Sequence, residues 1–156
     1  MDRATFAAGC FWGVEDAFRR TPGVIEVVSG HAGGHTSSPT YEQVSSGTTG
    51  HAESVEVTFD PAKTTYEKLV RCFFEIHDPT EFNRQGPDVG EQYRSVIFYH
   101  SPEQQEVAER IKKELAPQYL PKTIATSIEP AKEFWRAEEY HQHYAEKHPG
   151  QVVCHI

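Results

Sequence analysis

The cysteines are the side chains of this chain best suited to carry out chemistry. The 156 residues contain Cys10, Cys72 and Cys154. These thiols are too few and too far apart for a disulfide scaffold, and they lack the C-x-x-C spacing of a zinc knuckle or a thioredoxin-type dithiol. Their odd number, in a chain expected to work in a reducing compartment, indicates that one thiol acts as a reagent.

Cys10 has the surroundings of a nucleophile. It lies where an expected strand, Thr5–Ala8, meets a helix expected to begin at Phe11. The backbone N–H groups and the dipole at the start of a helix favour a thiolate. Phe11 and Trp12 bracket the thiol with aromatic surface. A small apolar residue packed at a strand end would suit the same surroundings, so position and composition alone leave both interpretations open.

Apolar periodicity predicts alternating strands and helices along the rest of the chain. One helix is expected to start near Thr64, where Glu67 completes a capping-box signature, and to end at Asp78-Pro79. Another opens with Ser101 as its cap and with proline in the first helical position. Strands are expected over Val24–Ser29, Ser54–Phe59, Ser95–Tyr99 and Thr126–Glu129, and a last helix over Ala137–Lys147.

Two long connecting segments, Gly30–Gly50 and Asp78–Gln92, are rich in Gly, Pro, His and Ser. Connections of this length within a compact domain are usually functional or disordered. We therefore interpret both segments as loops that build a site.

Composition excludes several classes of function. Lys and Arg number 15 against 23 Asp and Glu, a formal net charge of -8, whereas a nucleic-acid-binding protein needs a basic surface. No apolar run approaches the roughly 20 residues that span a bilayer. The apolar run near the N-terminus is too short for a signal peptide, so we expect a cytoplasmic protein.

The nine histidines do not form the spacing of a metal site. His31 and His35 bracket a glycine-rich segment, and His141 and His143 would lie on roughly opposite faces of a helix. Neither pair has the glutamate of a zincin motif, so no metal is expected.

The run Gly9-Cys10-Phe11-Trp12-Gly13 resembles the active-site signature of the A-type peptide methionine-sulfoxide reductases. The resemblance weakens after about Leu115 and returns near the C-terminus, so it covers nearly the whole chain. It implies one reductase domain over residues 1–156, with a flexible tail over 145–156. The further matching segments, in family order, are Gly33–Thr36 through Tyr41, Gly50–Glu53, His77–Thr80, Arg84–Ser95 and Ala137–Tyr144.

The resemblance implies both a fold and an activity. The fold is α+β, a two-layer α/β sandwich with a mixed sheet, a ferredoxin-like core and long active-site loops. The activity is the reduction of methionine S-sulfoxide, free and in proteins, as protein repair after oxidative damage. It needs no cofactor beyond an external reductant, thioredoxin or, in vitro, dithiothreitol. The expected enzyme is a cytoplasmic monomer without nucleic-acid or membrane partners.

By this resemblance Cys10 attacks the sulfoxide sulfur and is left as a sulfenic acid. Glu53 donates the proton that the sulfoxide oxygen needs as its bond to sulfur breaks. A carboxyl group can do so near neutral pH only if it is desolvated, for example against aromatic surface. Phe11 and Trp12 supply the apolar wall that holds the substrate methyl group.

The resemblance assigns three further residues to the sulfoxide oxygen. Tyr41 and Tyr93 donate hydrogen bonds to it, and Asp88 supports this polar group. Without the resemblance, both tyrosines would be interpreted as half-buried packing residues and Asp88 as a turn residue.

Recycling of the sulfenic acid requires a second thiol or a reductant. Many family members carry a cysteine where this chain has Ser45, so that route is not available here. Cys154 is then expected to form a disulfide with Cys10, which thioredoxin reduces by exchange. Cys72 flanks an apolar helical stripe and is expected to be a packed thiol. A second departure is His31, where the family usually has tyrosine.

Two other functions remain open from the residues. A thiol peroxidase would share the sulfenic acid chemistry but needs a cationic partner near its thiolate. A non-catalytic module that binds oxidised or native methionine segments would need only the aromatic pocket.

Overall fold

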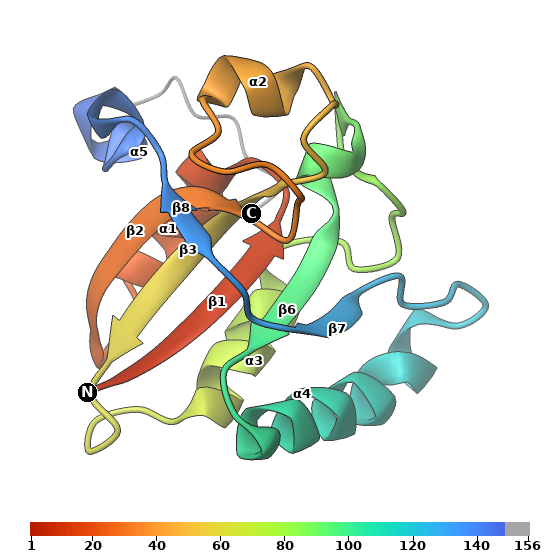
Figure 1. Ribbon diagram of the computed structural model, residues 1–156. Coiled ribbons are helices and arrows are strands. Elements are labelled where there is room, and N and C mark those ends of the chain that lie inside the picture. Colours follow the sequence, from red (N-terminus) through yellow and green to blue (C-terminus); the bar gives the residue numbers. More distant parts are fainter. Residues whose placement is uncertain (149–156) are drawn as a thin grey trace.

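Residues 1–148, which the computed structural model describes, contain a six-stranded mixed sheet with the order β7-β6-β1-β3-β2-β8 (Figure 1). Its edge strands are β7 (Ser127–Pro130) and β8 (Phe134–Arg136). β6 and β7 are parallel, and the other neighbours are antiparallel. The central elements are β1 (Asp2–Ala8), α1 (Phe11–Arg19), β2 (Val24–Ala32), β3 (Ala52–Phe59), α3 (Tyr66–Glu75) and β6 (Ser95–Tyr99).

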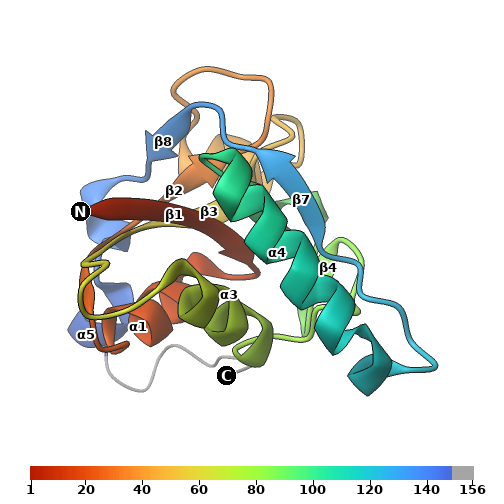
Figure 2. The same ribbon diagram turned by 90° about the horizontal axis from the view of Figure 1, so that it is seen from below.

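These elements form a ferredoxin-like core. In chain order they are strand, helix, two strands, helix and strand, and their strands lie in the order β6-β1-β3-β2. α1 and α3 cover one face of this sheet (Figure 2), and α4 (Pro102–Leu115) packs against α3 and β6. The α+β fold with a mixed sheet, predicted from the resemblance, is confirmed.

Aromatic side chains fill the layer between the sheet and these helices. The ring of Phe6 on β1 stacks on Phe18 of α1, with centroids 5.0 Å apart, and lies 5.3 Å from Phe73 of α3. All three side chains are buried. Each contributes about 1.5–3 kcal/mol through the removal of apolar surface from water. This layer fixes α1 on β1 and therefore fixes the junction that carries Cys10.

Helix starts follow local capping chemistry. Ser101 caps α4 as predicted, since its hydroxyl accepts the Gln104 N–H at 3.2 Å. The predicted cap of α3 at Thr64 is wrong. Thr65 is the cap and accepts the Lys68 N–H at 3.2 Å, because the Thr64 N–H bonds to the Asp60 carbonyl in the preceding turn. α3 also ends at Glu75, before the predicted stop at Asp78-Pro79.

The predicted helix over Ala137–Lys147 is also wrong. The chain forms a short turn of 3-10 helix, η3 (Glu139–His141), and the one-turn helix α5 (Tyr144–Lys147). Helix cannot continue between them because His143 has a left-handed backbone, with φ 56°. The preceding β8 (Phe134–Arg136) was not predicted, and the expected strand near Thr126 is β7 (Ser127–Pro130).

The two long connecting segments contain short elements of their own. The first holds α2 (Tyr41–Ser45), which a Thr40–Gln43 capping box starts. Figure 1 shows α2 at the end of the sheet to which β1 points. The second holds the hairpin of β4 (Arg84–Gln85) and β5 (Asp88–Val89), then the 3-10 turn η1 (Glu91–Tyr93); another 3-10 turn, η2 (Ala116–Tyr119), follows α4. No helix within residues 1–148 has the length and apolar character needed to cross a membrane.

Candidate active site

Cys10 stands between β1 and α1, in the cap position of α1, and is partly exposed. Its backbone has φ -58° and ψ 121°, so the chain turns from strand into helix at this residue. Its carbonyl accepts the Val14 N–H at 3.4 Å. The thiol is therefore held at a helix start, where the helix dipole favours a negative sulfur.

Glu53 on β3 connects directly to this helix start. Its Oε1 accepts the Phe11 N–H at 3.2 Å, and the side chain is only 1% exposed. Its Oε2 is buried and has no hydrogen-bond partner within the described residues. Burial, aided by the negative charge of Asp88 and partly offset by the Phe11 N–H, raises the pKa of Glu53 to about 8. The carboxyl group is thus predominantly protonated at neutral pH.

Aromatic rings surround the start of α1. The Phe11 ring lies 6.1 Å from Tyr41, and the Trp12 ring lies 6.3 Å from Tyr41. Tyr144 stacks on Trp12 with centroids 3.9 Å apart and rings 10° from parallel. The Trp12 indole N–H donates to His141 Nδ1 at 3.0 Å. Trp12 is therefore held both by stacking and by a directional hydrogen bond.

The two connecting segments bring polar groups to the same place. Tyr41 comes from α2 and Tyr93 from η1, and burial, followed by the negative charge of Glu53, raises the pKa of both hydroxyls. Both therefore remain O–H donors at neutral pH. Cys10 also acts electrostatically on both tyrosines, and Asp88 acts on Tyr93 as well as on Glu53. The structure thus brings together all five polar residues that the sequence singled out.

Two buried histidines belong to this neighbourhood and were not assigned to it from the sequence. His31 pairs with Glu53 in the β2–β3 ladder, and its ring centroid lies 5.6 Å from Phe11. It is 0% exposed, both ring nitrogens lack a partner in the described part of the chain, and burial lowers its pKa to about 4. The ring of His141 lies 4.3 Å from Tyr41. No local pattern in the sequence indicates this burial.

Of the other two cysteines, Cys72 lies within the described residues and Cys154 lies outside them. Cys72 on α3 has its sulfur 3.8 Å from the Thr21 hydroxyl, and burial raises the pKa of its thiol. Both features suit a packing role better than a nucleophilic one. Cys154, the predicted resolving thiol, and most of the predicted tail lie outside the described residues. Ser45 ends α2, and its hydrogen bond to Tyr41 partly offsets the raised pKa of that tyrosine.

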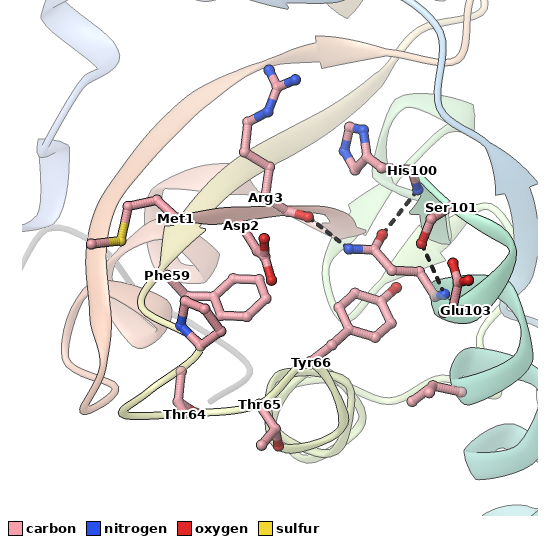
Figure 3. A pocket seen from close by; sticks show the side chains of 13 residues that line it. Met1, Asp2, Arg3, Phe59, Thr64, Thr65, Tyr66, His100, Ser101 and Glu103 are labelled. Carbon is pink, nitrogen blue, oxygen red and sulfur yellow. Dashed lines mark hydrogen bonds between the residues drawn. The ribbon is translucent and has the colours of Figure 1, made fainter.

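A cavity of about 550 Å³ lies away from Cys10, among the start of β1 and the starts of α3 and α4 (Figure 3). Phe59 and Tyr66 line it together with polar residues such as Arg3 and His100. None of its lining residues is a cysteine, so this cavity offers no thiol chemistry. Among residues 1–148, no group of three or more His, Cys, Asp or Glu side chains could hold a metal ion.

Comparison with known proteins identifies the arrangement around Cys10. A family model described as "Peptide methionine sulfoxide reductase" matches residues 2–156. The chain belongs to this family. As a peptide methionine sulfoxide reductase it is an enzyme that reduces methionine sulfoxide, which confirms the resemblance drawn from the motifs.

Individual reductases agree in sequence and structure. The peptide methionine sulfoxide reductase MsrA of Geobacter sulfurreducens is 57% identical over 151 residues, which cover 96% of this chain and 93% of that protein. Mxr1 from Saccharomyces cerevisiae in reduced form has a TM-score of 0.93 at 41% identity, over 98% of this chain and 88% of its own. Mxr1 in complex with Trx2 has a TM-score of 0.66 at 33% identity, over 92% and 84% of the two chains.

Proposed function

We propose that this enzyme is a thioredoxin-dependent peptide-methionine (S)-S-oxide reductase that acts on free and protein-bound substrate, with Cys10 as its nucleophile. The observation that carries this proposal is the buried carboxyl group of Glu53. Its Oε1 is bound to the N–H of the residue that follows Cys10, while its Oε2 has no partner among the described residues. An acid that stays protonated at neutral pH beside a thiol suits a substrate whose oxygen must be protonated.

In the proposed reaction the Cys10 sulfur attacks the sulfur of the sulfoxide while Glu53 gives its proton to the sulfoxide oxygen. A bond forms between the two sulfurs, the bond between sulfur and oxygen breaks, and the oxygen leaves as hydroxide. Hydroxide then attacks the Cys10 sulfur, which breaks the bond between the two sulfurs and releases the thioether. Overall, a thiol and a sulfoxide become a sulfenic acid on Cys10 and a thioether, so the Cys10 sulfur is oxidised and the substrate sulfur reduced. Glu53 recovers its proton from solvent before the next turnover.

The surrounding side chains fit the shape and polarity of this substrate. Tyr41 and Tyr93 keep their hydroxyl protons and can donate hydrogen bonds to the developing oxyanion. The negative charge of Asp88 helps to keep Glu53 protonated. Phe11 and Trp12 form the apolar wall for the methyl group. The preference for the S epimer rests on the family resemblance.

The sulfenic acid is proposed to condense with the thiol of Cys154, which releases water and forms a disulfide. Thioredoxin then exchanges its dithiol for this disulfide and returns both cysteines to thiols. The complex of yeast Mxr1 with Trx2 supports such a partner. The serine at position 45 and the raised pKa of Cys72 leave Cys154 as the preferred resolving residue.

We further propose that residues 1–156 act as one reductase domain, as a monomer in the cytoplasm, with no cofactor of its own and no nucleic-acid partner. The acidic composition, with a formal net charge of -8, supports the last point.

Assays of the two epimers of methionine sulfoxide, each with dithiothreitol as reductant, test the proposal. The parent should turn over the S epimer and not the R epimer, Cys10→Ser should be inactive, and the matched control Cys72→Ser should behave as the parent. No turnover of the S epimer, or activity that survives Cys10→Ser, would overturn the proposal. Turnover of peroxide instead would indicate a thiol peroxidase, and binding without turnover a recognition module.

A further inference from the structure

Glu15 is a buried carboxyl group for which the proposed reaction has no use. It lies on α1 one helical turn after Phe11 and is 0% exposed. Its Oε1 accepts the backbone N–H of His143 at 2.7 Å and the hydroxyl of Ser29 at 3.2 Å. Burial of a carboxyl group costs free energy, so the burial of Glu15 at this place calls for an explanation.

The residue before His143 is fastened to the sheet in the same place. The Gln142 side-chain oxygen accepts the Ser29 N–H at 2.9 Å, and its nitrogen donates to the carbonyls of Ser29 at 2.9 Å and Ala137 at 3.1 Å. Two consecutive residues are thus held in place. His143 is bound to Glu15 of α1, and Gln142 is bound to Ser29 of β2. The left-handed backbone of His143 points its N–H at Glu15.

The residues on either side of this attachment contact the proposed methyl pocket. His141 accepts the Trp12 indole N–H at 3.0 Å, and its ring lies 4.3 Å from that of Tyr41. Tyr144 stacks on the ring of the same Trp12, with its centroid 3.9 Å from that of Trp12. The His141–Tyr144 segment therefore holds Trp12 from both ends, and its own position depends on Glu15.

We propose that Glu15 is a positioning residue, whose buried oxygen accepts the His143 N–H and holds the His141–Tyr144 segment so that Trp12 and Tyr41 face the substrate. This inference rests on the proposed function for its kinetic consequence, because Trp12 and Tyr41 have been assigned to substrate there. Its structural consequence, the fixed environment of Trp12, is independent of any reaction.

The accepting oxygen matters in this role and the charge does not. Both donors contact Oε1, while Oε2 has no hydrogen-bond partner in the part of the chain that the structure describes. Arg19 is paired with Oε2 at an Nε–Oε2 distance of 3.8 Å, and it also pairs with Asp16 and Glu146. Burial raises the pKa of Glu15. A neutral side chain of the same length should therefore serve equally well.

Two conservative variants separate the effect of the position of the acceptor oxygen from the effect of the charge. Glu15→Gln keeps an acceptor oxygen at the same distance and removes the charge, whereas Glu15→Asp keeps the charge and withdraws the oxygen. Asp16→Asn, a neighbouring acid paired with Arg19 and Arg20 at the surface, is the control. All are made in a Trp135→Phe background, so that Trp12 is the only indole. Each variant is measured for acrylamide quenching of Trp12 fluorescence without substrate, and for KM and kcat with dithiothreitol.

We expect Glu15→Gln and Asp16→Asn to match the parent within about twofold, and Glu15→Asp to raise KM about tenfold with a smaller change in kcat, as for one lost hydrogen bond. Quenching of Trp12 should rise in Glu15→Asp alone. Parent-like quenching and KM in Glu15→Asp, or equal damage in Glu15→Gln, would overturn the proposal. A parent that fails to reduce the sulfoxide would contradict the proposed function, while the quenching comparison still decides the role of Glu15.

Discussion

Replacing Glu53 with glutamine should make the stability of the protein less sensitive to pH. The glutamine oxygen can accept the Phe11 N–H as Oε1 of the glutamate does, and the side-chain volume hardly changes. The substitution therefore removes the ionisation and keeps the contact. Activity should be lost at the same time, because an amide cannot supply the proton.

The size of the effect follows from the pKa of Glu53. An ordinary glutamate titrates at 4.5, and Glu53 titrates at about 8 in the folded protein. Below 4.5 the group is protonated in the folded and the unfolded chain, so it adds no pH dependence. Above 4.5 only the unfolded chain releases the proton, and each pH unit up to about 8 then costs the folded state about 1.4 kcal/mol. Above about 8 both states are ionised and the cost stays constant.

Urea unfolding of the parent and of Glu53→Gln at several pH values measures this difference. Between about pH 5 and about pH 7.5 the parent should lose about 3 kcal/mol of unfolding free energy relative to Glu53→Gln. Glu56→Gln, on the same strand with a more exposed side chain, is the control. A difference between parent and Glu53→Gln that does not change over this range would show that Glu53 titrates normally, and the assignment of a protonated acid would fail.

Three further predictions concern turnover. The rate at which the enzyme reduces the sulfoxide should fall as pH rises through about 8, because Glu53 loses the proton that it must donate. A rate that keeps rising above that pH contradicts this role. Cys154→Ser should match the parent with dithiothreitol and lose turnover with thioredoxin; full thioredoxin-driven turnover would direct attention to Cys72. Tyr93→Phe should lower kcat by about a hundredfold if its hydroxyl stabilises the oxyanion, measured beside Tyr99→Phe as a control outside the site; an unchanged kcat removes Tyr93 from the mechanism.

The junction at Cys10 could be predicted because its signal is local. The apolar period changes from that of a strand to that of a helix between Ala8 and Phe11, and Val14 and Phe18 continue it into the core. The cap of α4 could also be predicted, because Ser101 and Pro102, which mark the start of this helix, are adjacent in sequence. The strand order has no local signal, since β1 lies between β3 and β6, which are distant from it in sequence. The family resemblance supplied the fold class.

The C-terminal part shows why the rest could not be predicted. The periodicity of Ala137–Lys147 suits a helix, yet tertiary hydrogen bonds from Gln142 to Ser29 and from His143 to Glu15 determine its path. The same contacts bring His141 and Tyr144 to Trp12. Side chains whose partners lie more than a hundred residues away carry no signal in a local pattern. The burial of His31 beside Glu53 is likewise a property of strand register.

The central claim is that the Cys10 thiol is oxidised to a sulfenic acid when the sulfoxide is reduced. The most direct test is a single turnover of the S epimer by Cys154→Ser without reductant, followed by trapping with dimedone and peptide mass spectrometry. Our account predicts a single equivalent of methionine and a dimedone adduct on Cys10, with none on Cys72. Methionine formed without an adduct on Cys10, or an adduct on Cys72 instead, would contradict it.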